Sequence, residues 1–139
     1  MIRFRFGLLF GASLMLAAAS LNPATAQTGA ADEAIRLIAS RSVGVPEDTF
    51  EVSSTGPVLT VVRVNSTMNA STHQGRNDEA GAIAAAISGE FTRKGVQYSQ
   101  IQSISVDYVE RVGTPAHDSL VDRIDFRKNP AGKFLLHKS

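Results

Sequence analysis

Hydrophobic positions are most concentrated at the amino terminus, where residues 6–21 are apolar apart from small residues and two serines. Arg3 and Arg5 precede this run, and the small-x-small triplet 24–26 follows it. A positive start, an apolar stretch and small residues at its exit are typical of a secretory signal peptide cut at the end of the triplet, with residues 17–19 as a second possible cleavage site. The apolar run of 16 residues is shorter than the roughly 20 that span a bilayer core, which favours cleavage over an anchor.

Two later segments repeat apolar side chains every three or four positions, the spacing of one helix face. The first runs from Ala30 to about Arg41 and stops before Gly44 and Pro46. The second runs from Ala80 to Lys94. Both segments are predicted to be amphipathic helices. Their periodic apolar residues are Ala31, Ala34, Ile35 and Ile38 in the first helix and Ile83, Ile87 and Phe91 in the second.

Shorter segments rich in β-branched and aromatic residues are predicted to be strands. These strands are expected at residues 49–53, 58–64, 104–108, 120–127 and 133–137.

The third and fourth strands alternate in polarity, which predicts a hairpin with one dry and one wet face. The expected dry face holds Ile104, Val106, Tyr108, Leu120, Ile124 and Phe126, and the expected wet face holds Asp107, Arg123, Asp125 and Arg127. We expect Asp107 to pair with Arg123 or Arg127.

The element order α-β-β-α-β-β-β indicates an α+β fold, with two helices packed on one face of an antiparallel sheet of about four to five strands. Residues 1–26 are predicted to be the signal peptide, cut after Ala26, and residues 27–139 a single small domain.

The amino-acid composition limits which cellular compartment and which classes of partner are expected. Without Arg3 and Arg5, the 14 basic residues fall to 12 against 13 acidic ones, a balance that disfavours nucleic acid as a partner. The chain has no cysteine, which excludes disulfides, thiolate metal sites and a cysteine nucleophile. An exported protein without disulfides favours a bacterial periplasm or the medium.

Motifs for catalysis and cofactors are missing from the sequence. It has no glycine-rich phosphate loop, no H-E-x-x-H, no G-x-S-x-G and no histidine pair at metal-ligand spacing. We therefore expect no cofactor, no metal and no transmembrane segment after signal cleavage. Catalysis is disfavoured, since distant residues would have to meet in a cleft.

The polar segment 65–77 is the first candidate surface, because a long loop without apolar periodicity is often functional. Backbone amides at the start of the second helix, with nearby basic side chains, can hold a carboxylate or phosphate. The ligand-binding candidates are His73, Gln74, Arg76 and Asn77. The alternative is ordinary helix capping, by Asn77 or by a capping box formed by Ser71 and Gln74.

The carboxyl-terminal region is the second candidate surface, with basic residues interleaved with aromatic ones. Its interaction candidates are Arg123, Arg127, Lys128, Lys133, His137 and Lys138. Such a patch can meet another exported protein or a cell-envelope polyanion. The alternative is that lysines protect an exposed sheet edge from pairing with other chains.

These patterns predict a periplasmic or secreted, non-catalytic protein that acts by binding or as an accessory structural unit. The alternative is a small exported enzyme with a site formed by the 65–78 loop and the polar face of the 101–127 hairpin. Convergence of His73, Arg76 and Asp107 in the fold would favour the enzyme, and a scatter of these residues beside an open sheet edge would favour the binding protein.

Overall fold

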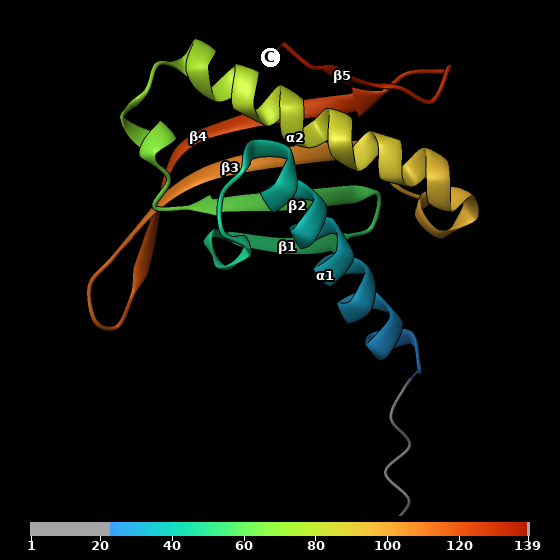
Figure 1. The fold of residues 1–139 in the computed structure, drawn as a ribbon, viewed down its shortest axis with the longest axis horizontal. Helices are drawn as coiled ribbons and strands as arrows, with labels where there is room; N and C mark the ends of the chain where they lie inside the picture. Colours follow the sequence, from blue (N-terminus) through green and yellow to red (C-terminus); the bar gives the residue numbers. More distant parts are fainter. Residues whose placement is uncertain (1–22, 139) are drawn as a thin grey trace, which may run out of the picture.

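The computed structural model of the chain describes residues 23–138 (Figure 1). Within that range the chain forms two α-helices, three short 3₁₀ helices and five strands. In chain order these elements are α1 Pro23–Val43, η1 Glu47–Thr49, β1 Phe50–Thr55, β2 Val58–Val64, η2 Thr67–Ala70, α2 His73–Lys94, η3 Gly95–Tyr98, β3 Ser103–Val112, β4 His117–Lys128 and β5 Phe134–Leu136.

The predicted α+β class and element order are confirmed, but the sheet is mixed and not wholly antiparallel. Its strand order is β1-β2-β3-β4-β5, and β2 and β3 run parallel while the other neighbours run antiparallel. The physical reason lies in α2, whose 22 residues rise about 33 Å and return the chain to the end at which β2 began. A helix that connects two neighbouring strands favours their parallel pairing.

Both helices lie on the same face of the sheet, as predicted, and the core lies between them and the strands (Figure 1). The fully buried aliphatic and aromatic side chains come from α1, α2 and the inner faces of the strands. They include Ile35, Phe50, Leu59, Val61, Ile83, Ile87, Ile104, Val106 and Tyr108.

Leu120 is the one expected dry-face residue that the structure places elsewhere: it is 57% exposed. Tyr108 pairs with Asp122, but the next residue, Val109, pairs with Leu120, so the strand carries a β-bulge at Val121. One extra residue reverses the alternation beyond the bulge. Leu120 therefore turns to the face away from the helices.

The expected loop 65–77 is shorter than predicted, because η2 occupies its middle and α2 begins at His73. Neither Asn77 nor Ser71 caps the helix. The N-cap is Thr72, whose hydroxyl oxygen accepts a hydrogen bond from the amide of Gly75 at 3.1 Å. The strand β4 likewise begins at His117, three residues before the expected start of that strand at residue 120.

Residues 1–22, most of the predicted signal peptide, lie outside the described residues. Among the α1 residues whose side chains the structure describes, the core contacts are made by Ala31, Ile35, Ile38, Ala39 and Val43. All five follow position 27 and would remain in a chain that starts at Gln27. Among the described residues, no helix has the length and apolar content needed to cross a bilayer.

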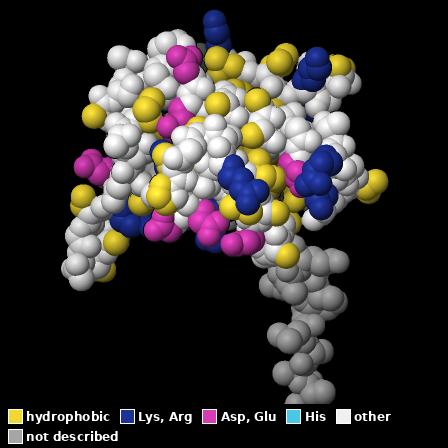
Figure 2. Space-filling view, in the orientation of Figure 1, with side chains coloured by type: hydrophobic (Ala, Val, Ile, Leu, Met, Phe, Trp, Pro, Cys, Tyr) yellow, Lys and Arg dark blue, Asp and Glu magenta, His cyan; other side chains and the backbone are white. Residues whose placement is uncertain are grey.

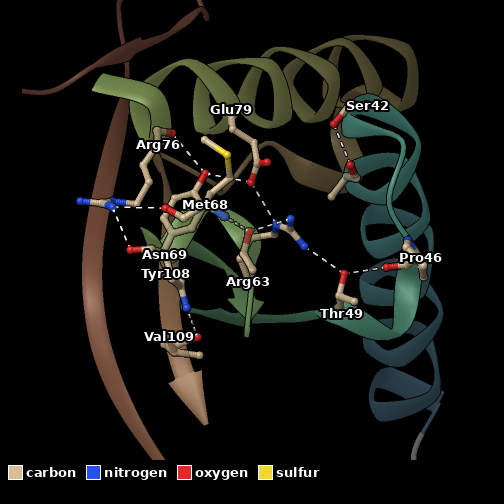
Figure 3. A network of polar contacts seen from close by, with 12 residues as sticks. Ser42, Pro46, Thr49, Arg63, Met68, Asn69, Arg76, Glu79, Tyr108 and Val109 are labelled. Atoms are coloured by element: carbon tan, nitrogen blue, oxygen red, sulfur yellow. Dashed lines mark hydrogen bonds and ion pairs between the residues drawn. The ribbon is translucent and has the colours of Figure 1, made fainter. Parts of the chain in front are cut away.

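A buried guanidinium ties α2 to the sheet. Arg63, on β2, is 3% exposed. Its guanidinium lies over the ring of Phe50, with 4.6 Å between the guanidinium carbon and the ring centroid. Figure 3 shows the hydrogen bonds that Arg63 makes with neighbouring segments of the chain. Its Nε donates to Glu79 Oε1 at 3.0 Å, Nη1 to Thr49 Oγ1 at 2.9 Å and Nη2 to Ser66 Oγ at 3.0 Å.

Tyr108 completes this network from β3. Its hydroxyl donates to Glu79 Oε1 at 3.2 Å and lies 3.1 Å from the carbonyl oxygen of Arg76. Burial, followed by the charge and hydrogen bond of Glu79, raises the pKa of Tyr108, so the phenol keeps its proton. The buried charges are therefore paired and hydrogen-bonded, which the low-dielectric interior requires.

We expect Glu79→Gln to lower the free energy of unfolding by about 3 kcal/mol or more, since Arg63 would keep a buried charge without its counterion. Urea denaturation followed by circular dichroism measures this change. The matched control is Glu33→Gln, which breaks the exposed pair with Arg36 and should cost less than about 1 kcal/mol. Equal costs for the two substitutions would contradict the role assigned to Arg63.

Candidate functional site

A pocket of about 360 Å³ lies where the first turns of α2 meet β4 and the carboxyl-terminal end of β5. Its walls are His73, Asn77, Arg123, Ile124, Asp125, Leu136, His137 and Lys138. Two of these residues belong to the first candidate surface and three to the second. The fold thus brings the two surfaces that were predicted separately into one concave site.

The convergence has a simple structural cause. Thr72 caps α2 so that the helix begins at His73, and β5 pairs antiparallel with β4 through Phe126 to Lys128. The amide of His137 then donates to the carbonyl oxygen of Asp125 at 2.8 Å, which extends this pairing by one step. The chain after β5 is consequently held beside the start of α2.

Asp122 stands next to the pocket and links α2 to β4. Asp122 shares the register of Ile124 and Phe126 and therefore lies on the helix-covered face. Its Oδ2 accepts a hydrogen bond from Arg76 Nε at 2.8 Å and lies 2.7 Å from His73 Nδ1. Burial opposes ionisation of Asp122, but the hydrogen bonds from Arg76 and His73 outweigh it and lower the pKa of this carboxyl.

Asp122 was not among the residues singled out from the sequence. A usable signal exists, since Asp122 falls at the period-2 spacing of the core residues Ile124 and Phe126. A carboxylate at a core-facing position of a strand needs a buried partner. That partner, Arg76, is 46 residues away in the chain.

Arg76 is placed beside the site but its guanidinium is already engaged. Besides Asp122, its Nη1 donates to the carbonyl oxygen of Ser71 at 2.6 Å and to those of Met68 and Asn69 at 3.2 and 3.4 Å (Figure 3). The side chain therefore fastens the η2 segment to α2 and β4. Gln74 points elsewhere, because its Nε2 donates to Asp78 Oδ1 at 2.8 Å.

The basic candidates of the carboxyl-terminal region do not form one patch. Arg123 is paired with Asp107 on the helix-free face, at 2.6 and 2.7 Å, which confirms the predicted cross-strand pair. Arg127 lies opposite Leu135 on the same face. Lys128 sits over the ring of Phe134, 5.9 Å from its centroid. The remaining candidate outside the pocket, Lys133, lies in the β4–β5 connection, and its amide bonds to Asn129.

His73, Arg76 and Asp107 do not converge. Asp107 lies on the face of β3 that looks away from α2, while His73 and Arg76 meet Asp122 on the other face. The three-residue cluster that would have favoured the enzyme is therefore absent from residues 23–138. In the same range no three His, Asp or Glu side chains are grouped to hold a metal ion.

A second depression, about 580 Å³, lies between η2 and the base of the β3–β4 hairpin. Part of its polar wall is paired with the protein. Asn65 bonds to the backbone of Arg111, whose guanidinium in turn holds Glu51 and Asp118. We take the pocket at α2 as the candidate site, because residues of both predicted surfaces line it.

Comparisons of the chain with protein-family models, with curated proteins and with solved structures give no match.

Asp122→Asn tests the link between α2 and β4. A carboxyl whose pKa is lowered in the folded protein stabilises the fold fully when the pH is above its unfolded-state pKa of about 3.9. This contribution is lost as the pH falls through the pKa of the folded state. We expect the substitution to cost about 1–3 kcal/mol at pH near 7 and progressively less below pH of about 4.

Urea denaturation over this pH range measures the effect. The matched control Asp78→Asn removes an exposed carboxylate from α2, the helix that Asp122 contacts, and should change the free energy of unfolding by less than about 0.5 kcal/mol. A cost for Asp122→Asn that stays constant as the pH falls would contradict the assignment.

Proposed function

We propose that this protein is a small exported binding domain without catalytic activity, and that its ligand site is the pocket between α2, β4 and β5. The observation that carries the proposal is the convergence of His73 and Asn77 with His137 and Lys138 around one cavity. Its volume of about 360 Å³ falls in the range of small-molecule sites, toward the lower end. Its wall is more polar than that of most small-molecule sites, since Ile124 and Leu136 are the apolar residues among the eight that line it.

Rigid elements support this site. The position of α2 is fixed by the buried Arg63–Glu79 pair and by Tyr108. The contact of Arg76 with Asp122 fixes the helix against β4 at the pocket itself. A cavity whose walls are held by buried ion pairs is pre-formed, so a ligand does not have to order them on binding.

The absence of a catalytic constellation favours binding over chemistry. Within the described residues the pocket wall contains no serine, threonine or tyrosine hydroxyl to act as a nucleophile. Asp107 lies on the helix-free face, where its carboxylate is ion-paired with Arg123. A binding protein needs none of these groups.

A hydrolase is the second candidate, and the contact of His73 with Asp122 favours it. A carboxylate that orients an imidazole is the arrangement of a general base, which could activate water beside the pocket. Hydrolysis of a p-nitrophenyl ester by the protein, lost in His73→Gln, would favour this candidate over binding alone.

Blocking the pocket tests the proposed site. Leu136 is 43% exposed and lines the pocket, so Leu136→Trp is expected to fill it and to abolish the binding of fragments detected by saturation-transfer NMR. The matched control is Leu135→Trp, because Leu135 is 54% exposed but lies opposite Arg127 on the other face. Fragments that bind the protein should still bind this control.

Circular dichroism of both variants checks that the fold persists. If no fragment binds the protein, or if binding survives equally in both variants, the pocket is not the ligand site.

Export is the other part of the proposal, with a periplasmic or secreted location. When the full chain is expressed in a bacterium, we expect the periplasmic or culture fraction to contain a protein whose intact mass corresponds to a start at Gln27. Replacing Ala24 and Ala26 by phenylalanine should block the cut, since the peptidase accepts small side chains there. An uncut protein that stays in the cytoplasm would contradict export.

A further inference from the structure

Resting on the proposed function, we propose that the ligand of the pocket at α2, β4 and β5 is a small amphipathic anion, with one carboxylate or similar group and a short apolar chain. Three features of the pocket favour such a ligand: the charges that the fold leaves facing it, the apolar part of its wall and its size.

The acidic groups around the pocket are already neutralised or turned away. Asp122 is ion-paired with Arg76 at 2.8 Å and also contacts His73. Asp125 lines the pocket, but its carboxylate accepts a hydrogen bond from Ser105, which lies on the helix-free face. One oxygen of this carboxylate is therefore held by a hydroxyl group of the helix-free face.

Basic side chains that line the pocket remain available to a ligand. Within the part of the chain that the structure describes, His137 and Lys138 make no ion pair, and both line the pocket. The side chain of His73 is 64% exposed, and its Nδ1 faces Asp122, so its Nε2 can donate to an anion when the ring is in the imidazolium form. Asp78, the exposed carboxylate on the same helix, is held by Gln74. The side chains left at the cavity thus favour a negative ligand.

The start of α2 adds to this preference. The helix begins at His73, and the first-turn amides of an α-helix carry a partial positive charge toward its amino end. Thr72 uses one of these amides, that of Gly75, for the cap. The dipole reinforces the side chains named above and is not needed to define the site.

An apolar wall sets the second property of the ligand. Ile124 is almost fully buried at 2% exposure, whereas Leu136 is 43% exposed beside it. A short hydrocarbon chain would cover Leu136 and bury apolar surface at about 25 cal/mol per Å².

The size and surroundings of the site point to a small molecule and not to a polyanion. The pocket volume is about 360 Å³. On the face of the molecule drawn in Figure 2, acidic and basic side chains are interspersed, with neither sign gathered into a broad field. A polyanion needs an extended basic surface, whereas a small carboxylate needs only a local one.

The test is a titration of the purified protein, near neutral pH, with three six-carbon probes that differ in charge: hexanoate, hexanol and hexylammonium. In ¹⁵N-correlated NMR spectra, hexanoate should shift the amides of residues 73–77, 123–125 and 136–138 and should bind more tightly than the other two probes. Lys138→Gln should weaken hexanoate about two- to fivefold, the effect of losing one partly exposed charge contact. His73→Gln should weaken it as well, because it removes a side chain that lines the pocket.

The matched control is Lys133→Gln, because Lys133 lies outside the pocket in the β4–β5 connection. This variant should bind hexanoate like the unchanged protein. An equal loss in Lys133→Gln would show a nonspecific charge effect and overturn the proposal.

The outcomes separate this inference from the proposed function. If hexylammonium or hexanol binds in the pocket as tightly as hexanoate, the anionic class is overturned while the pocket stands as a ligand site. If hexanoate shifts none of the pocket amides, the anionic class is also overturned, and the fragment screen with Leu136→Trp decides independently whether the pocket binds any ligand.

Discussion

The arrangement of this domain depends on one buried charge, the guanidinium of Arg63 on β2. A buried charge is tolerated only when partners satisfy it, and those partners come from α2, from η1 and from the segment between β2 and α2. The same carboxylate of Glu79 that balances Arg63 also receives the hydroxyl of Tyr108. The position of α2 over the sheet is therefore defined by directional polar contacts as well as by apolar packing, which has no direction.

A second constraint acts at β4, where the bulge at Val121 separates two registers of the strand. On one side of it Asp122 faces α2 and meets Arg76, and on the other side Leu120 faces away from the core. Bulges commonly redirect side chains at strand edges and near binding sites. Here the bulge lies directly before Asp122 and marks the point at which the register that carries Asp122, Ile124 and Phe126 begins.

The site itself combines residues that no local pattern connects. His73 lies at the start of a helix and Lys138 after the last strand, yet the pairing of β5 with β4 brings them to one cavity. Arg76 shows the opposite outcome, since its donors are used for carbonyl oxygens and Asp122. A basic side chain in a polar segment can equally well bind a ligand or fasten a loop, and only its neighbours in space distinguish the two roles.

The sequence by itself determined the α+β class, the element order and the dry and wet faces around Val106 and Asp107, because the periods of apolar residues reflect contacts between near neighbours in the chain. Tertiary structure decided the parallel pairing of β2 with β3, the exposure of Leu120 and the role of Asp122. These features depend on strand register, on one inserted residue and on partners tens of residues away. Periodicity carries no information about such long-range pairing, so the pocket emerged only once the helices and strands were packed together.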